Sequence, residues 1–193
     1  MVLPLQHWRE LYERHKKTAL CLDIEVSRFN GPISVVGLYQ PKDGLIECQQ
    51  LVKGRGLTRE NLSKAFAGCT MLITFNGRKF DIPRIKREFP GIIPNVPILD
   101  LYLLARRLGL QANLKVLENT FGIDRLDPRT KRKGIAVKLW KRYITYGDER
   151  ALALLLEYNK QDTVNLYPLA EELTRVGMRK PELLAKPSKN KLF

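Results

Sequence analysis

Histidine, cysteine and long apolar runs are scarce in this sequence of 193 residues. Its two histidines are His7 and His15, and its three cysteines, Cys21, Cys48 and Cys69, lack the Cys-x-x-Cys spacing of zinc sites. An odd number of cysteines in apolar surroundings favours reduced thiols in an intracellular protein. No apolar run approaches the roughly 20 residues of a membrane span, and charge appears too early for a signal peptide. The sequence predicts a soluble, cytoplasmic protein with no membrane partner.

Negative charge is also in short supply. The chain has 34 Lys and Arg against 20 Asp and Glu, a formal net charge of +14. Such an excess favours a polyanionic partner such as nucleic acid, although a basic scaffold, a ribosome-associated protein or a membrane-surface protein would share it. Length and apolar content predict one domain with a substantial core. We assign residues 1–177 to that domain and residues 178–193 to a basic, mobile tail.

Residues 18–27, TALCLDIEVS, alternate with the period of a β-strand. Asp23 and Glu25 have the same parity as Ala19 and Cys21, so both acids point the same way from the last third of the strand. The ends of strands are where α/β sheets place their sites. Two interpretations are open for this face, a functional site or an amphipathic strand with a solvated acidic side.

The rest of the chain predicts a mixed sheet with helices on its faces. Strands at 33–39 and 45–52, joined by the turn-forming sequence PKDG, should form a meander with the first strand. The other expected elements are helices at 5–16, 58–66, 113–122 and 134–145, a strand at MLITF, and a long helix after Asp148 that is interrupted at Pro168. Thr58, Asp81, Asn113 and Asp148 are candidate N-caps.

More acids occur at the boundaries of these elements. Asp81 follows the MLITF strand at a helix start, and Tyr158 and Asp162 are four residues apart on one helix face. A Tyr-x-x-x-Asp pair alone is common by chance, and a half-buried tyrosine beside a solvated acid explains it equally well. Only the combination of the acids favours a site.

Together these motifs resemble the DEDD exonuclease superfamily, a branch of the ribonuclease H-like fold. They are Asp23-x-Glu25, Asn76-x-x-x-Phe80-Asp81 and Tyr158-x-x-x-Asp162. The tyrosine is typical of the tyrosine-bearing subclass, because the histidine-bearing one expects His where this chain has Glu157. CLDIEV, LITFNGRKFDIPRI, NLKVLENTFGI and LLLEYNKQDTVNLYPLAEEL are similar to YprB-like ribonuclease H-like domains, across roughly residues 18–176. The resemblance implies an α/β fold whose mixed central sheet contains an antiparallel meander flanked by helices.

The resemblance also implies a two-metal 3′–5′ exonuclease that acts on DNA or RNA. Asp23 would bridge both metals, Glu25 and Asp162 would complete one site, and Asp81 would act mainly through water at the other. Tyr158 would orient the attacking water. Paired divalent cations stabilise the nucleophile, the phosphoryl oxygens and the leaving oxygen in such reactions, and all-oxygen ligands suit Mg²⁺ or Mn²⁺.

Basic residues gather around the second and third motifs, and no acid occurs between Asp127 and Asp148. We expect these residues to bind the phosphate backbone, with an ordinary solvated surface as the alternative. The candidates are Asn76, Arg78, Lys79, Arg129, Lys131, Arg132, Lys133, Lys138, Lys141 and Arg142. Trp140, Tyr143 and Ile144 have helical spacing and are expected in the core rather than against bases.

Three alternatives to an exonuclease remain open at this point. They are an endonuclease or structure-specific nuclease on the same fold, a nucleic-acid-binding module that does not cut, and a basic scaffold in which the acids coincide by chance. The polarity of digestion rests on the resemblance, as does the expected single-stranded 3′ end. The choice of DNA or RNA, the preferred metal and the oligomeric state stay undetermined.

Overall fold

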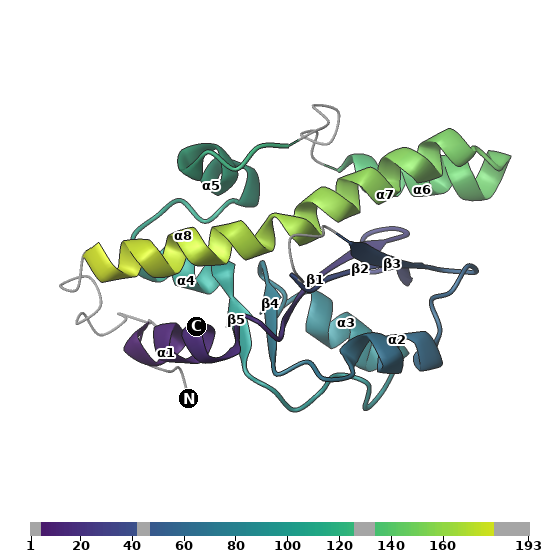
Figure 1. Ribbon diagram of the computed structural model, residues 1–193. Coiled ribbons are helices and arrows are strands. Elements are labelled where there is room, and N and C mark those ends of the chain that lie inside the picture. Colours follow the sequence, from purple (N-terminus) through teal and green to yellow (C-terminus); the bar gives the residue numbers. More distant parts are fainter. Residues whose placement is uncertain (1–4, 42–46, 126–133, 180–193) are drawn as a thin grey trace.

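A mixed five-stranded sheet forms the centre of the protein, in the order β3-β2-β1-β4-β5. The structure is a computed structural model that describes residues 5–41, 47–125 and 134–179 (Figure 1). Its strands are β1 (Ala19–Val26), β2 (Ile33–Tyr39), β3 (Cys48–Val52), β4 (Met71–Thr74) and β5 (Ile98–Asp100). Strands β1, β2 and β3 form the expected antiparallel meander, and β4 and β5 extend the sheet in parallel with β1. The predicted fold class is confirmed.

Both faces of β1 are buried, because side chains of opposite parity enter different parts of the core. Leu20, Leu22, Ile24 and Val26 pack with side chains of α2 (Arg59–Phe66) and α3 (Asp81–Glu88). Ala19 and Cys21 are fully buried on the other face, against α8 (Leu166–Arg179). A solvated acidic strand face is therefore wrong. Asp23 and Glu25 continue the second face and are themselves only partly exposed.

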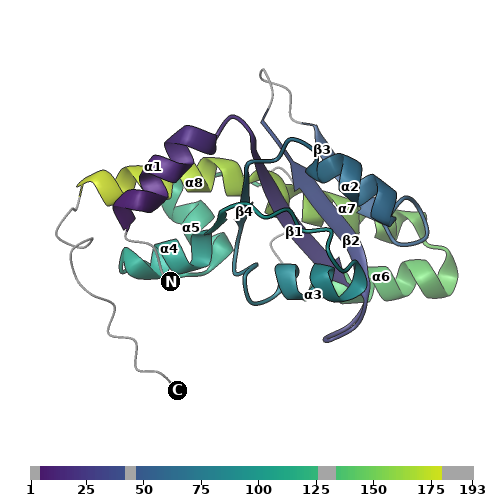
Figure 2. The ribbon, with the colours of Figure 1, turned by 90° about the horizontal axis from the view of Figure 1, so that it is seen from below.

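Helices lie on both sides of the sheet (Figures 1 and 2). Helices α2 and α3 cover one face, and α7 (Glu149–Val164) crosses the other, where it packs on β1, β2 and β3. The remaining helices are α1 (Leu5–His15), α4 (Leu101–Arg107), α5 (Leu114–Phe121) and α6 (Ile135–Tyr146). No helix in the described ranges is both long and apolar enough to span a membrane.

Three of the four predicted N-caps are confirmed. Thr58, Asn113 and Asp148 each accept a hydrogen bond from the backbone N–H three residues later. Asp81 is not a cap, because it is the first residue of α3 and Phe80 occupies the cap position without a side-chain bond. Its carboxylate is thereby left for a contact with β1.

Two details of the later helices differ from expectation. The long helix is interrupted at Asn165, three residues before Pro168, because a proline fits the first turn of the new helix α8, where its missing N–H costs nothing. Trp140 is buried as predicted, but Ile144 is 61% exposed, since the buried side of α6 runs through Ala136 and Leu139 instead. Residues 42–46 of the predicted turn and strand lie outside the described ranges. The tail is predicted from residue 178, but α8 continues to Arg179, and the rest of the tail lies outside the described residues.

Candidate metal centre

Strand β1 places Asp23 and Glu25 on the face of the sheet that α7 crosses. The residue opposite Asp23 in the ladder with β2 is Gly37. A Cβ atom at this position would collide with Thr163 and Asn159 of α7. The glycine thus allows the helix backbone to approach the two acids closely, which the acid motifs alone did not indicate.

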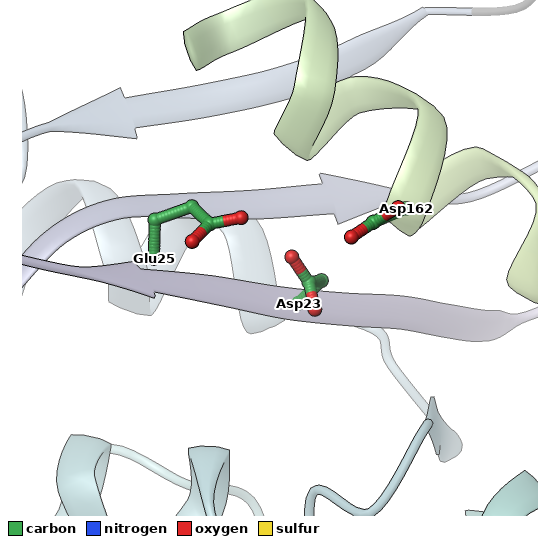
Figure 3. A group of neighbouring side chains, drawn as sticks. All are labelled: Asp23, Glu25 and Asp162. Carbon is green, nitrogen blue, oxygen red and sulfur yellow. The ribbon is translucent and has the colours of Figure 1, made fainter. Parts of the chain in front are cut away.

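Helix α7 adds the third acid. One carboxylate oxygen from each of Asp23, Glu25 and Asp162 lies within 4.8 Å of the others, the spacing of a group that can hold a metal ion. Figure 3 shows the three side chains turned toward one another from β1 and α7. Residues more than 130 positions apart in the sequence thus form one cluster, which we call the acid cluster.

Asp81 lies beside the acid cluster rather than within the group of three. Strand β1 pairs with β4 as far as Cys21, and beyond that point the N–H of Ile24 donates to Asp81 Oδ1 at 3.0 Å. The first turn of α3 therefore supplies the acceptor that a longer β4 would have provided. Asp81 is 3% exposed and electrostatically coupled to the cluster, because its charge raises the pKa of both Asp23 and Glu25.

Burial and mutual repulsion make the ionised acids costly in the metal-free protein. Burial raises the pKa of Asp23 and Glu25 well above their usual range, and the neighbouring carboxylates raise both further. Burial also raises the pKa of Asp81 to about 7, against the opposing effect of its backbone hydrogen bonds. Asp23 Oδ2 accepts a hydrogen bond of 2.9 Å from Asn159 Nδ2, which lowers its pKa in part. A bound cation would remove the repulsion and favour the ionised forms.

Tyr158 lies one turn before Asp162 on α7, and its ring contacts a lysine from α5. Lys115 Nζ is 3.4 Å from the phenol oxygen and 4.6 Å from the ring centroid. Burial raises the pKa of Tyr158, and the charges of Asp162, Glu25 and Asp23 raise it further. The phenol therefore stays protonated at neutral pH and is suited to donating or accepting a hydrogen bond rather than to acting as a base.

A buried arginine, Arg125, contacts Asp162. Arg125 donates to Glu118 through Nε at 2.7 Å and Nη2 at 2.8 Å, and Nη2 also donates to Asp162 Oδ1. Glu118 Oε1 in turn accepts a hydrogen bond of 3.0 Å from Asn165 Nδ2. Sequence reasoning missed Arg125 and Glu118, and no spacing rule would have paired them. The one available indication was a glutamate within the apolar pattern of α5.

Sequence reasoning also missed Asp100, which organises the segment before Asp81. Its carboxylate accepts hydrogen bonds from the backbone N–H groups of Asn76, Arg78, Tyr102 and Leu103 at 2.9 to 3.5 Å. Asn76 has a left-handed backbone with φ of 60°, a conformation that asparagine tolerates better than most residues. The left-handed backbone at this position therefore explains why an asparagine suits it.

The predicted basic residues fall into three groups in the structure. On α6, Lys138 and Lys141 are exposed, and Arg142 is exposed but donates to Asp148. After β4, Arg78 donates to Ile98 O at 2.8 Å and its guanidinium lies over the Trp8 ring, while Lys79 is exposed beside it. The third group, Arg129, Lys131, Arg132 and Lys133, lies outside the described residues.

Comparisons with known proteins point to one superfamily. A family model described as the RNase H superfamily matches residues 20–174, most of the chain. The crystal structure of the catalytic core of RRP6 from Trypanosoma brucei, mutant C496S, has a TM-score of 0.60 at 15% identity. That similarity covers 95% of this chain and 48% of the RRP6 chain, so the present chain spans about half of that length. It supports the fold.

A second solved structure is the EXD2 exonuclease domain soaked in Mn and GMP. It is 19% identical over 96% of this chain and 92% of its own, with a TM-score of 0.35, which is too low to compare the two folds in detail. None of the curated proteins matches the chain significantly.

Proposed function

This chain belongs to the RNase H superfamily, and from that premise we propose that it is a metal-dependent nuclease that hydrolyses phosphodiester bonds of DNA or RNA from a 3′ end. The observation that carries the proposal is the acid cluster, in which Asp23, Glu25 and Asp162 bring carboxylate oxygens within 4.8 Å of one another beside Tyr158. The finer assignment, to tyrosine-bearing DEDD exonucleases and YprB-like domains, rests on the three motifs. So does the 3′–5′ polarity.

The residues present fit hard divalent cations. The cluster offers only carboxylate oxygens, which suit Mg²⁺ or Mn²⁺ better than zinc. Its members are partly or fully buried and repel one another, so the site favours positive charge. Asp23, Glu25 and Asp162 would hold one metal, and Asp23, with Asp81 acting mainly through water, would hold a second. When bound, such a pair activates water and stabilises charge on the phosphoryl and leaving oxygens.

The remaining side chains orient the reactants. Tyr158, protonated at neutral pH, hydrogen-bonds and orients the attacking water. Lys115 holds the phenol from one side at 3.4 Å and adds positive charge near the acid cluster. Asn159 holds Asp23 through its amide at 2.9 Å. These contacts fix side-chain positions before substrate arrives, which is how a rigid site lowers the cost of reaching the transition state.

The substrate is held by positive charge. Lys138 and Lys141 present exposed amines on α6, which packs against α7. We assign them to the phosphate backbone, together with Lys79 and the predicted basic residues outside the described ranges. The three cysteines are free, in keeping with the cytoplasmic location that we propose.

Digestion of end-labelled oligonucleotides tests the proposal. Single-stranded DNA and RNA carrying a 5′ label are incubated with Mg²⁺, with Mn²⁺ or with EDTA, beside an Asp23→Ala variant. We expect a ladder of shortened 5′-labelled products that needs a divalent metal and disappears in the variant. Cleavage that persists in Asp23→Ala would contradict the mechanism.

Two further substrates and one binding assay separate the alternatives. A covalently closed circular strand is resistant to an exonuclease and is cut by an endonuclease, and a branched duplex reports a structure-specific activity. Metal-independent binding without cleavage of any substrate would identify a binding module. In the binding assay, replacing Lys138 and Lys141 with Gln should reduce the slope of affinity against salt, by about 0.7 for each phosphate of a single strand that the variant no longer neutralises.

A further inference from the structure

Asp162 differs from its two partners in the acid cluster because a helix, and not β1, supplies it. Asp23 and Glu25 are fixed two residues apart on one rigid strand. Asp162 comes from α7, only three residues before the interruption at Asn165. Its carboxylate oxygen Oδ1 accepts a hydrogen bond from Arg125.

Asp162 is held by a group of three buried residues, Arg125, Glu118 and Asn165, which we call the clamp. The side chains of Arg125 and Glu118 are each 2% exposed, and the side chain of Asp162 is 11% exposed. Arg125 uses two nitrogens to bind both oxygens of Glu118, so its planar group has one orientation. Asn165 fixes Glu118 from the end of α7. The arrangement joins α5, the segment after it and α7 at the carboxylate of Asp162.

A buried ion pair is weak evidence of stabilisation, because the two charges lose their hydration. The ion pair of Arg125 with Glu118 and Asp162 can have another use, which is to orient the Asp162 carboxylate. A carboxylate has room for more than one partner, and Asp162 accepts from Arg125 through Oδ1. Figure 3 shows that the same carboxylate is turned toward Asp23 and Glu25. Groups behind a metal ligand commonly set its orientation in this way, and their loss costs about 10- to 100-fold in metal affinity or activity.

We propose that Arg125, anchored by Glu118, is a positioning residue that holds the Asp162 carboxylate in its metal-binding orientation. The inference rests on the proposed function, since it assigns a partner to one of the proposed metal ligands. It is distinct from simple charge compensation. Lys115 also carries a positive charge near Asp162 and Glu25, whereas Arg125 additionally holds the Asp162 carboxylate by a directed hydrogen bond.

The two roles predict opposite changes in metal affinity, which gives the test. Binding of MnCl₂ alone is measured by the electron paramagnetic resonance signal of free Mn²⁺. Arg125→Met should weaken binding about 10- to 100-fold if the arginine positions Asp162. If it acts only through charge, its removal makes the site more negative and binding becomes tighter.

A comparison of the single variant with a double variant tests whether weaker Mn²⁺ binding comes only from a loss of stability. Arg125→Met leaves Glu118 buried without its ion-pair partner, so its melting temperature should fall. Adding Glu118→Gln removes that charge and keeps an acceptor for Asn165. We expect the double variant to recover much of the thermal stability while Mn²⁺ binding stays weak. Recovery of both would show that Arg125 only supports the fold and would overturn the proposal.

Two further variants complete the series. Arg125→Lys retains the charge but not the two-nitrogen fork, and should bind Mn²⁺ with intermediate affinity. Should Arg125→Met fail to fold, Arg125→Lys decides alone, and wild-type affinity in it would refute positioning. Arg55→Gln removes a distant exposed ion pair with Glu149 and should bind Mn²⁺ like wild type. A change in this control would mean that the method reports overall charge, and the proposal would lose its support.

Failure of this inference and failure of the proposed function give different results. If the wild-type protein neither binds Mn²⁺ nor cleaves, the nuclease proposal fails and the positioning role falls with it. If the wild type binds and cleaves but Arg125→Met binds Mn²⁺ equally well, the nuclease proposal stands. In that case the role of Arg125 alone is refuted.

Discussion

Two strands of the same sheet carry buried acids with opposite surroundings. At the end of β5, Asp100 accepts hydrogen bonds from the backbone N–H groups of four residues and joins two segments of chain. On β1, Asp23 and Glu25 face Asp162 across a few ångströms, and repulsion adds to burial in raising their pKa. Hydrogen-bond donors of the protein itself satisfy Asp100, whereas the acids on β1 are placed where a cation would be needed.

The comparison shows that burial alone does not identify a functional acid. Asp100 is 4% exposed, less than Asp162 at 8%, yet its partners explain it completely as a structural acceptor. What distinguishes the acid cluster is the convergence of like charges from separate elements. Perturbed carboxylates of this kind gather at functional sites. Asp81 has features of both classes, since it accepts from Ile24 and is also coupled to the cluster.

The largest expected effect is the loss of nuclease activity when a member of the acid cluster is replaced. Asp23→Asn removes the charge that both proposed metals share, and hydrolysis should fall by roughly 10³-fold or more, since a metal contributes several kcal/mol to the transition state. The measurement is the rate of nucleotide release at saturating Mn²⁺. Glu149→Gln, which changes an exposed acid at the start of α7, is the control and should keep wild-type activity. Equal rates in both variants would contradict a catalytic role for the acid cluster.

The second largest effect is expected on the free energy of unfolding when Asp100 is replaced. Asp100→Ala leaves the N–H groups of Asn76, Arg78, Tyr102 and Leu103 without their acceptor. We expect the free energy of unfolding to drop by about 3 kcal/mol, measured by urea denaturation. Thr58→Ala, which removes the N-cap of α2 far from the site, should cost about 1 kcal/mol. A smaller loss in Asp100→Ala than in Thr58→Ala would contradict the structural role.

Metal binding should stabilise the protein through the acid cluster alone. At a Mn²⁺ concentration about 100 times the dissociation constant, the folded state gains about 2.7 kcal/mol, because the ion binds the native site and not the unfolded chain. The melting temperature of the wild type should therefore rise with MnCl₂ and return with EDTA. Asp23→Asn should show no rise. A rise of the same size in Asp23→Asn would locate the metal elsewhere.

The smallest expected effect is on the pH dependence of the metal-free protein. The raised pKa of Asp81, about 7 against an ordinary value of 3.8, means that the folded protein binds a proton that the unfolded chain releases. Stability gained in this way is present at low pH and is lost as pH rises through about 7. We expect unfolding in EDTA to need about 1 kcal/mol less at pH 8 than at pH 6. Asp81→Asn should make this profile shallower without abolishing it, because the raised pKa of Asp23 and of Glu25 acts in the same direction. An unchanged profile would contradict the assignment.

The sequence by itself determined the local structure and the acids of the site. Alternation along β1, the caps Thr58, Asn113 and Asp148, and the apolar periods predicted most elements, because these depend on neighbours within a few residues. The motifs identified Asp23, Glu25, Asp81, Tyr158 and Asp162 as candidates, and the structure brings Asp23, Glu25 and Asp162 into one cluster beside Tyr158 and Asp81.

Only the tertiary structure decided what surrounds those acids. That Gly37 allows α7 to approach β1, that Asp81 completes the edge of β1 rather than capping its own helix, and that Arg125 joins Glu118 to Asp162 all depend on contacts between distant segments. No local pattern encodes such contacts, since each depends on where the sheet and α7 bring side chains together in three dimensions. The partners of a charged group, and hence its electrostatic state, are properties of the folded chain.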